Sequence, residues 1–135
     1  MFERLEIKVL PPGPRLAAEV RFLVDGEDVV AEATGPGGFG AYAGRLFPPH
    51  APSPLAATGP PRRVELGEPE CTGGCCGHLS AVVQRIGGVV RWSDWEVPQL
   101  RDGTRGRFPE FDFEAEPYDA ELARTAADPW WRYRG

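Results

Sequence analysis

Residues 79–97, which read LSAVVQRIGGVVRWSDWEV, decide the fold of this chain. Two runs rich in β-branched and aromatic residues flank Gly87-Gly88, and such a glycine pair is typical of the two-residue turn of a β-hairpin. The stretch therefore predicts two antiparallel strands, over residues 79–86 and residues 89–97.

The register of this hairpin follows from the length of its turn. A two-residue turn places Val83 opposite Trp92 and Ala81 opposite Asp94. Successive side chains of a strand point to opposite faces, so one face of the pair is apolar and the other is mixed. The apolar face carries Leu79, Ala81, Val83, Val90 and Trp92, and the mixed face carries Val82, Ile86, Val89 and Trp95. Strands with apolar residues on both faces are typical of a sandwich, or of a sheet covered by a helix or a loop.

Further strands are expected on both sides of the hairpin. Alternating apolar residues predict strands at 5–9, 20–24, 29–33, 64–66 and 108–115. Asp25-Gly26 predicts a turn that joins the second and third of these into another hairpin. A helix is expected to begin at Pro117, because proline is favoured in the first turn. The helical spacing of Tyr118, Leu122 and Ala126 predicts its buried face.

These elements predict one mainly β domain over residues 1–135, an antiparallel sandwich-like or curved sheet with one C-terminal helix. Residues 34–62 hold six of the 17 glycines and seven of the 15 prolines, and predict a long loop. Five apolar residues are expected to anchor this loop to the core: Phe39, Tyr42, Leu46, Phe47 and Leu55.

The composition favours a globular protein of the cytoplasm. The net charge is −5 with acids and bases interspersed, which argues against a nucleic-acid-binding face. No run approaches the roughly 18 apolar residues of a membrane helix, and the first residues do not resemble a secretory signal. The 3 cysteines lie close together and do not form the framework of a secreted fold. We therefore expect a cytoplasmic protein that binds neither nucleic acid nor a membrane.

The segment 71–78, CTGGCCGH, concentrates side chains that bind metals. Three thiols and one imidazole would fill the four positions of a tetrahedral zinc site. The four residues are Cys71, Cys75, Cys76 and His78, with His50 as a remote alternative. The spacing is unusual, because zinc loops commonly supply Cys-x-x-Cys pairs from two segments. The favoured interpretation is nevertheless that the cysteines pack a tight connection, because a free cysteine behaves as a small buried apolar residue. A reactive thiol beside His78, or a reducible Cys71–Cys75 disulfide, is a further alternative. The expected cofactor is therefore none, or one zinc ion.

Two other motifs have ordinary structural explanations. The stretch GPGGFG at residues 35–40 matches the glycine spacing of a dinucleotide-binding loop, but no helix of useful length is expected after it. The acidic row Glu110, Asp112 and Glu114 would accept a basic partner or a cation. Such a row is more typical of the solvated face of an edge strand, where charge discourages aggregation.

Tryptophans supply the candidate contact surface for a partner. Trp92 and Trp95 lie in the hairpin, and Trp130 and Trp131 lie in an arginine-containing tail. Tryptophan and arginine are enriched in the residues that dominate protein interfaces. For the tail, docking back onto the core is the favoured interpretation and partner binding is the alternative, because exposed tryptophans favour aggregation.

The second half of the chain carries three features in sequence: ECTGGCCG at residues 70–77, the tryptophan hairpin, and YDAE at residues 118–121. In these features it resembles small uncharacterised proteins of high-GC bacteria. The resemblance implies no activity, only that the cysteine turn and the hairpin form one unit. The leading hypothesis is a non-catalytic interaction module with a protein partner. The alternative is a metal-binding or thiol-redox-responsive protein that uses residues 71–78, and an enzyme is the least favoured class.

Overall fold

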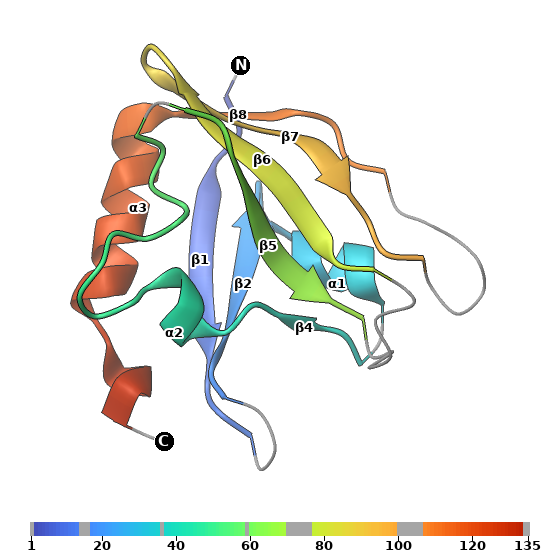
Figure 1. The fold of residues 1–135 in the computed structure, drawn as a ribbon, viewed down its shortest axis with the longest axis vertical. Helices are drawn as coiled ribbons and strands as arrows, with labels where there is room; N and C mark the ends of the chain where they lie inside the picture. The colour runs from blue at the N-terminus through green and yellow to red at the C-terminus, as the bar shows by residue number, and fades with distance from the viewer. Residues whose placement is uncertain are drawn as a thin grey trace.

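The computed structural model of the chain describes residues 2–13, 17–35, 37–58, 60–69, 77–99 and 107–133. In these residues the strands form two antiparallel sheets, and one long helix follows them, as the sequence predicts (Figure 1). The first sheet, in the order β1-β2-β3, consists of β1 (Leu5–Leu10), β2 (Glu19–Val24) and β3 (Glu27–Asp28). The second, in the order β4-β5-β6-β7-β8, consists of β4 (Phe39–Gly40), β5 (Arg62–Glu68), β6 (Leu79–Ile86), β7 (Val89–Glu96) and β8 (Phe111–Glu114). The helices are α1 (Val29–Thr34), α2 (Ala43–Leu46), α3 (Ala115–Ala127) and the 3₁₀ helix η1 (Trp130–Tyr133).

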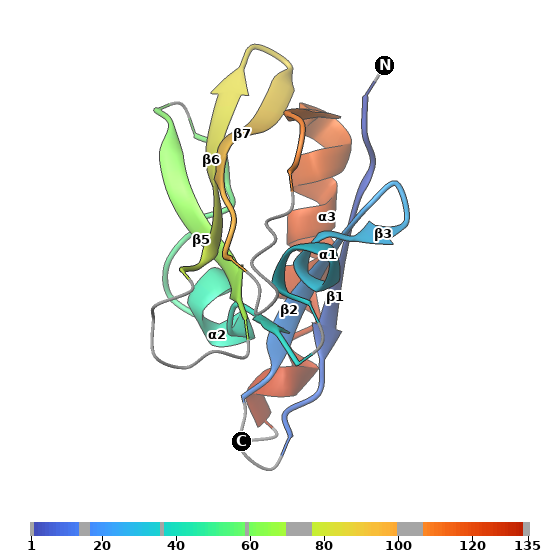
Figure 2. The same cartoon turned by 90° about the vertical axis from the view of Figure 1, so that its right-hand side faces the viewer.

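The two sheets face each other, with the core between them (Figure 2). At one side they are joined by the main chain, because the N–H of Val20 in β2 donates to the carbonyl of Ala41 at 2.9 Å. At the other side the N–H of Glu3 donates to the carbonyl of Asp112 in β8 at 2.9 Å. Beyond this contact α3 lies between β1 and β8 and packs against both. The fold is therefore a sandwich whose open side is closed by the C-terminal helix.

The predicted central hairpin is confirmed. β6 and β7 meet at Gly87-Gly88, and Val83 lies opposite Trp92. The predicted apolar face points into the core, where each of its members is at most 2% exposed: Leu79, Ala81, Val83, Val90 and Trp92. The mixed face points outward, and Ile86 on it is 47% exposed.

A β-bulge in β7 corrects the predicted register at the open end of the hairpin. Ser80 pairs with Glu96, so Ala81 faces both Asp94 and Trp95 instead of Asp94 alone. Asp94 is exposed and has a φ of 49°, in the left-handed region that aspartate tolerates better than most residues. The extra residue moves Trp95 from the predicted outer face to the inner one, where its ring centroid lies 6.2 Å from that of Trp92.

Residues 29–33 form helix α1, and the predicted return strand is wrong. The side chain of Asp28 accepts a hydrogen bond from the N–H of Ala31 at 3.0 Å, which is the geometry of a helix N-cap. The buried side chains of this segment have helical spacing: Val29, Val30, Ala33 and Thr34. The β-branched residues and the preceding turn favoured a strand, but the cap at Asp28 starts a helix after only two residues of β3.

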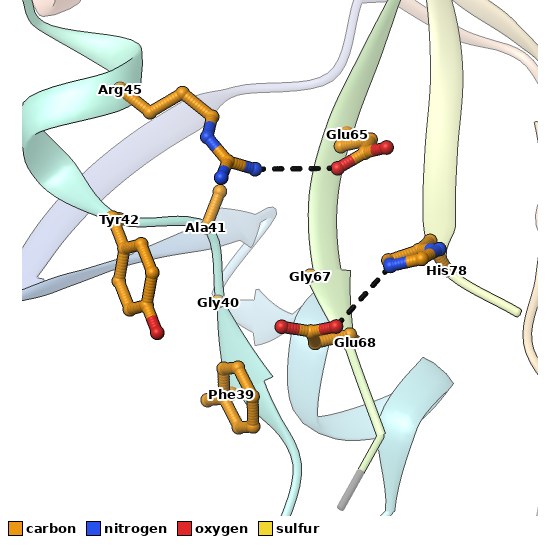
Figure 3. A pocket seen from close by; sticks show the side chains of 9 residues that line it. All are labelled: Phe39, Gly40, Ala41, Tyr42, Arg45, Glu65, Gly67, Glu68 and His78. Atoms are coloured by element: carbon orange, nitrogen blue, oxygen red, sulfur yellow. Dashed lines mark hydrogen bonds and ion pairs between the residues drawn. The ribbon is translucent and has the colours of Figure 1, made fainter. Parts of the chain in front are cut away.

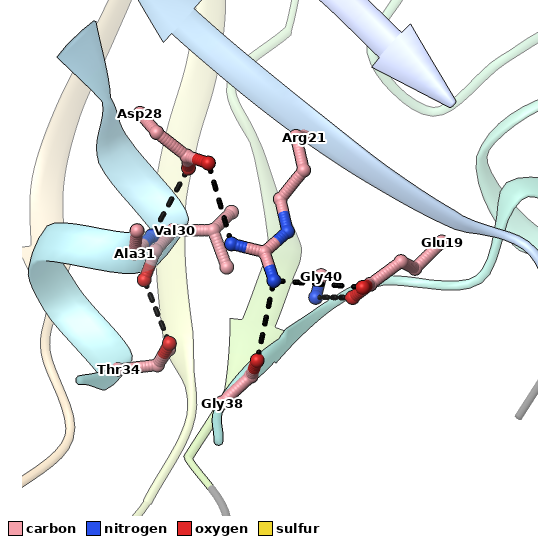
Figure 4. A network of polar contacts seen from close by, with 8 residues as sticks. All are labelled: Glu19, Arg21, Asp28, Val30, Ala31, Thr34, Gly38 and Gly40. Atoms are coloured by element: carbon pink, nitrogen blue, oxygen red, sulfur yellow. Dashed lines mark hydrogen bonds and ion pairs between the residues drawn. The ribbon is translucent and has the colours of Figure 1, made fainter. Parts of the chain in front are cut away.

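Arg21 of β2 holds α1 and β4 against the first sheet (Figure 4). Its Nη1 lies 3.3 Å from Oδ2 of Asp28, and its Nη2 donates to the carbonyl of Gly38 at 3.2 Å. Glu19, on the same strand, accepts a hydrogen bond from the N–H of Gly40. A Cβ at Gly40 would overlap a main-chain carbonyl of β2, so this close crossing requires glycine. The glycine-rich stretch therefore allows the chain to pass β2 closely.

The predicted loop at residues 34–62 contains the two short elements β4 and α2. Leu46, Phe47 and Leu55 anchor it, because each is at most 3% exposed. Phe39 is half-buried and Tyr42 is exposed, so these two expected anchors contribute less. The segment is thus attached to the core mainly through its aliphatic residues and Phe47.

The end of the chain follows the prediction in outline. β8 covers only Phe111–Glu114 of the predicted strand, and α3 begins at Ala115, two residues before the expected start at Pro117. Phe111 and Phe113 of β8 point into the core, and Pro117 lies in the first turn of α3. The predicted helix residues Tyr118 and Leu122 are buried. The next buried residue on this face is Thr125, whereas the predicted Ala126 is exposed. An α-helix has 3.6 residues per turn, so buried positions recur at spacings of three as well as four.

Tyr118 connects the core of the sandwich to the long loop. Its hydroxyl accepts a hydrogen bond from Nε1 of Trp92 at 3.2 Å and donates one to the carbonyl of Leu55 at 2.7 Å. The ring of Trp92 lies edge-on to Phe22 and Phe113, with centroid separations of 5.5 and 5.3 Å. Burial raises the pKa of Tyr118, so the hydroxyl stays protonated and able to donate at neutral pH.

Replacing Tyr118 with phenylalanine should destabilise the fold without changing its shape. The Y118F variant leaves the indole N–H and the Leu55 carbonyl buried without their partner, which costs about 1–3 kcal/mol of unfolding free energy. Urea denaturation of the variant and the wild type measures this difference. The matched control is Tyr42→Phe at an exposed tyrosine, where we expect a change within about 0.5 kcal/mol. Equal effects of the two substitutions would contradict the role given to the Tyr118 hydroxyl.

Candidate functional site

Only one of the four predicted zinc ligands lies in the described part of the chain. Cys71, Cys75 and Cys76 fall outside it, whereas His78 directly precedes β6. Nε2 of His78 is 3.2 Å from Oε2 of Glu68, the last residue of β5 (Figure 3). The antiparallel pairing of β5 with β6 brings these two side chains together at the base of the cysteine turn. Sequence reasoning missed Glu68, although it lies only three positions before Cys71.

In the Glu68–His78 pair, the carboxylate of Glu68 holds the imidazole of His78 in one orientation. A carboxylate that holds one nitrogen of an imidazole fixes the tautomer of the ring, and this arrangement supports both metal-bound histidines and histidine bases. The side chains of His78 and Glu68 are 44% and 39% exposed, so their contact contributes at most about 1 kcal/mol to stability. Among the described residues, no three His, Cys, Asp or Glu side chains gather as a metal site. His50 is exposed after α2.

A small hollow lies beside this pair (Figure 3). Its volume is about 30 Å³, which accommodates one or two waters and no organic ligand. Arg45 and Glu65 pair across it at 3.4 Å, and the Arg45 guanidinium lies 5.9 Å from the ring centroid of Tyr42. The hollow therefore offers polar groups to a water or a small ion.

The tryptophans do not form the exposed surface that was expected of them. Trp92 is 0% exposed and Trp131 is 6% exposed. Trp95 and Trp130 are half-buried and pack against the same core. Nε1 of Trp95 also donates to the carbonyl of Pro109 at 2.9 Å. These side chains stabilise the domain, and Trp130 and Trp131 pack back onto the core, as the favoured interpretation of the tail predicts.

A much larger groove lies between β1 and α3. Its volume is about 700 Å³, within the range of roughly 300–1,000 Å³ that is typical of ligand sites. The apolar part of its lining consists of Phe2, Leu5, Phe113, Pro117, Tyr118 and Ala120. The charged part consists of Glu3, Arg4, Glu6, Glu114, Glu121 and Arg124. A second hollow of about 500 Å³ shares four of these charged residues and continues along β1 to Leu10 and Trp130.

Glu121 and Arg124 hold α3 against the edge of β1. The N–H of Ile7 donates to Oε2 of Glu121 at 2.6 Å, and Nη2 of Arg124 donates to the carbonyl of Ile7 at 2.8 Å. The two side chains thus take the place of a neighbouring strand, and they pair with each other at 2.7 Å. Burial alone would raise the pKa of Glu121, but the hydrogen bonds from Arg124 and from Ile7 N–H outweigh it and lower the pKa.

The acidic row on β8 is partly neutralised by the neighbouring strand. Nε and Nη2 of Arg91 donate to the two carboxylate oxygens of Asp112 at 2.8 and 3.2 Å. This forked hydrogen bond holds the pKa of Asp112 below its usual range. Glu110 lies 3.5 Å from the same guanidinium. Glu114, the third member of the row, lines the groove beside α3.

Replacing Glu121 with glutamine should make the stability of the fold less dependent on pH. The folded-state pKa of Glu121 is lowered, so its ionised form stabilises the fold above the unfolded-state pKa of about 4.3. This contribution is lost as the pH falls through the unfolded and then the folded value. We expect E121Q to be less stable than the wild type by about 1 kcal/mol at pH 7, with a smaller difference near pH 3. Urea titrations across this range measure the effect, and a difference independent of pH would contradict it.

Comparisons with known proteins identify no relative of the chain. No protein-family model matches it, and searches of curated proteins and of solved structures find no significant match. Within the described ranges, none of the helices is both long enough and apolar enough to cross a membrane.

Proposed function

We propose that the protein is a small non-catalytic interaction module, and that a segment of a partner protein binds in the groove between β1 and α3. The groove itself is the observation that carries this proposal, because its volume is about 700 Å³ and its lining combines six apolar with six charged residues. Phe2, at the edge of the groove, is 47% exposed. An apolar floor with a polar rim is the usual composition of a protein recognition site. The groove replaces the four tryptophans as the candidate contact surface, because their side chains pack in or against the core.

Filling the groove should abolish partner binding and leave the fold intact. Ala120 is exposed on α3 and lines the groove, so the indole of A120W would occupy the space that a partner needs. Peptides selected from a random display library on the wild-type protein supply the ligands, and we expect A120W to weaken their binding at least tenfold. The control A126W places the same side chain at an exposed alanine of α3 that lines none of the hollows described above. Equal binding by A120W and the wild type would refute the groove as the binding site.

A second candidate is a metal-binding or thiol-redox-responsive protein that uses the cysteine turn. The Glu68–His78 pair favours it, because Glu68 would orient the imidazole for a metal or a thiol. Cys76 is two residues from His78, so their Cα atoms are at most about 7 Å apart. In this proposal, Cys71, Cys75, Cys76 and His78 bind one zinc ion.

Metal analysis of the reduced, tag-free protein tests the second candidate. We expect close to one zinc ion per chain, with thiols that react only after a chelator removes the metal. Loss of the supporting carboxylate in E68Q should weaken zinc binding by about 10- to 100-fold. The control H50A alters the remote imidazole and should bind zinc as the wild type does. Absence of metal, with thiols that react only after unfolding, would contradict both the metal and the thiol versions.

A further inference from the structure

The groove between β1 and α3 is lined by more acids than bases. The acids are Glu3, Glu6, Glu114 and Glu121, and the bases are Arg4 and Arg124. Arg124 is already paired with Glu121 at 2.7 Å. Glu3 uses its carboxylate to accept the N–H of Asp112 at 2.8 Å. Glu6 and Glu114 form no ion pair with another described residue. Arg4 likewise forms no ion pair with another described residue, so the unpaired side chains of the groove carry a net negative charge that is available to a ligand.

The shape of the groove restricts what it can hold. Its two adjoining hollows are lined by successive residues of the first strand region, from Phe2 to Leu10. At the rise of a β-strand these residues extend over roughly 26 Å. α3 forms the opposite wall along this length. A space that follows a β-strand over this length suits an extended segment of chain better than a compact ligand.

We infer that the occupant is an extended peptide segment of a partner protein, with an apolar side chain flanked by arginine or lysine. This inference rests on the proposed interaction function and adds the chemistry of the partner. The apolar side chain would contact Phe2, Pro117 and Ala120, and the basic side chains would pair with Glu6 and Glu114. A nucleic acid or an anionic lipid surface would instead bring phosphates toward these acids, and like charges repel.

Two synthetic peptides that differ only in charge test the inference. One is the acetylated hexapeptide amide RLRWRL, and the other carries glutamate in place of each arginine. Each is titrated into the ¹⁵N-labelled protein, and amide chemical shifts report both the affinity and the residues affected. We expect the basic peptide to shift amides of β1 and of the first half of α3, with an affinity at least tenfold above that of the acidic peptide. Added salt should weaken the binding.

Variants of the two available acids sharpen the result. E6Q and E114Q should each weaken the basic peptide about three- to fivefold, as expected for a partly exposed ion pair. The control E116Q alters an exposed acid of α3 outside the groove lining and should bind as the wild type does. Equal affinity for the two peptides within the groove would refute the basic partner and leave the interaction function standing. Shifts away from the groove with both peptides would refute the groove as well.

Discussion

Within the core, the hydroxyl of Tyr118 joins three separate parts of the chain. It belongs to α3, accepts the indole N–H of Trp92 in β7, and donates to the Leu55 carbonyl in the long loop. All three groups are buried. Without these two hydrogen bonds they would have no partner, and an unpaired polar group in the protein interior is costly. The position of the helix, the depth of the loop and the rotamer of the central tryptophan therefore depend on one another. The aromatic cluster around Trp92 supplies the apolar area, and the hydroxyl selects one arrangement of it.

α3 has two roles, and they meet in the groove. Its buried face closes the sandwich through Tyr118, Leu122 and Thr125. Its polar face supplies Glu121 and Arg124 to the main chain of Ile7, which prevents the edge of β1 from pairing with another strand at this point. The same two side chains, Glu121 and Arg124, also line both hollows of the groove. In the proposed function, stability and recognition thus depend on neighbouring residues of the same helix.

The parts of the fold that follow local periodicity were predictable from the sequence. The Gly87-Gly88 hairpin and the Val83–Trp92 pairing depend only on turn length and strand alternation. The bulge at Asp94 was not predictable, because a single residue in the left-handed conformation leaves no periodic pattern in the sequence. Helix α1 depends on the cap at Asp28. The two valines that follow Asp28 favour a strand, so the sequence pattern did not indicate this helix. For the candidate sites, His78 was predictable from its residue type. Glu68 and the groove arise from residues brought together by pairing between distant segments.

The contacts that close the sandwich lie far apart along the chain. Glu3 bonds to Asp112 across 109 positions, and Ile7 bonds to Arg124 across 117. During synthesis, the edge of β1 leaves the ribosome on the order of ten seconds before the helix that covers it. In that interval its main-chain N–H and carbonyl groups are open to other nascent chains and to chaperones. The rate of translation, as well as the sequence, therefore sets how long this protein is exposed to mispairing.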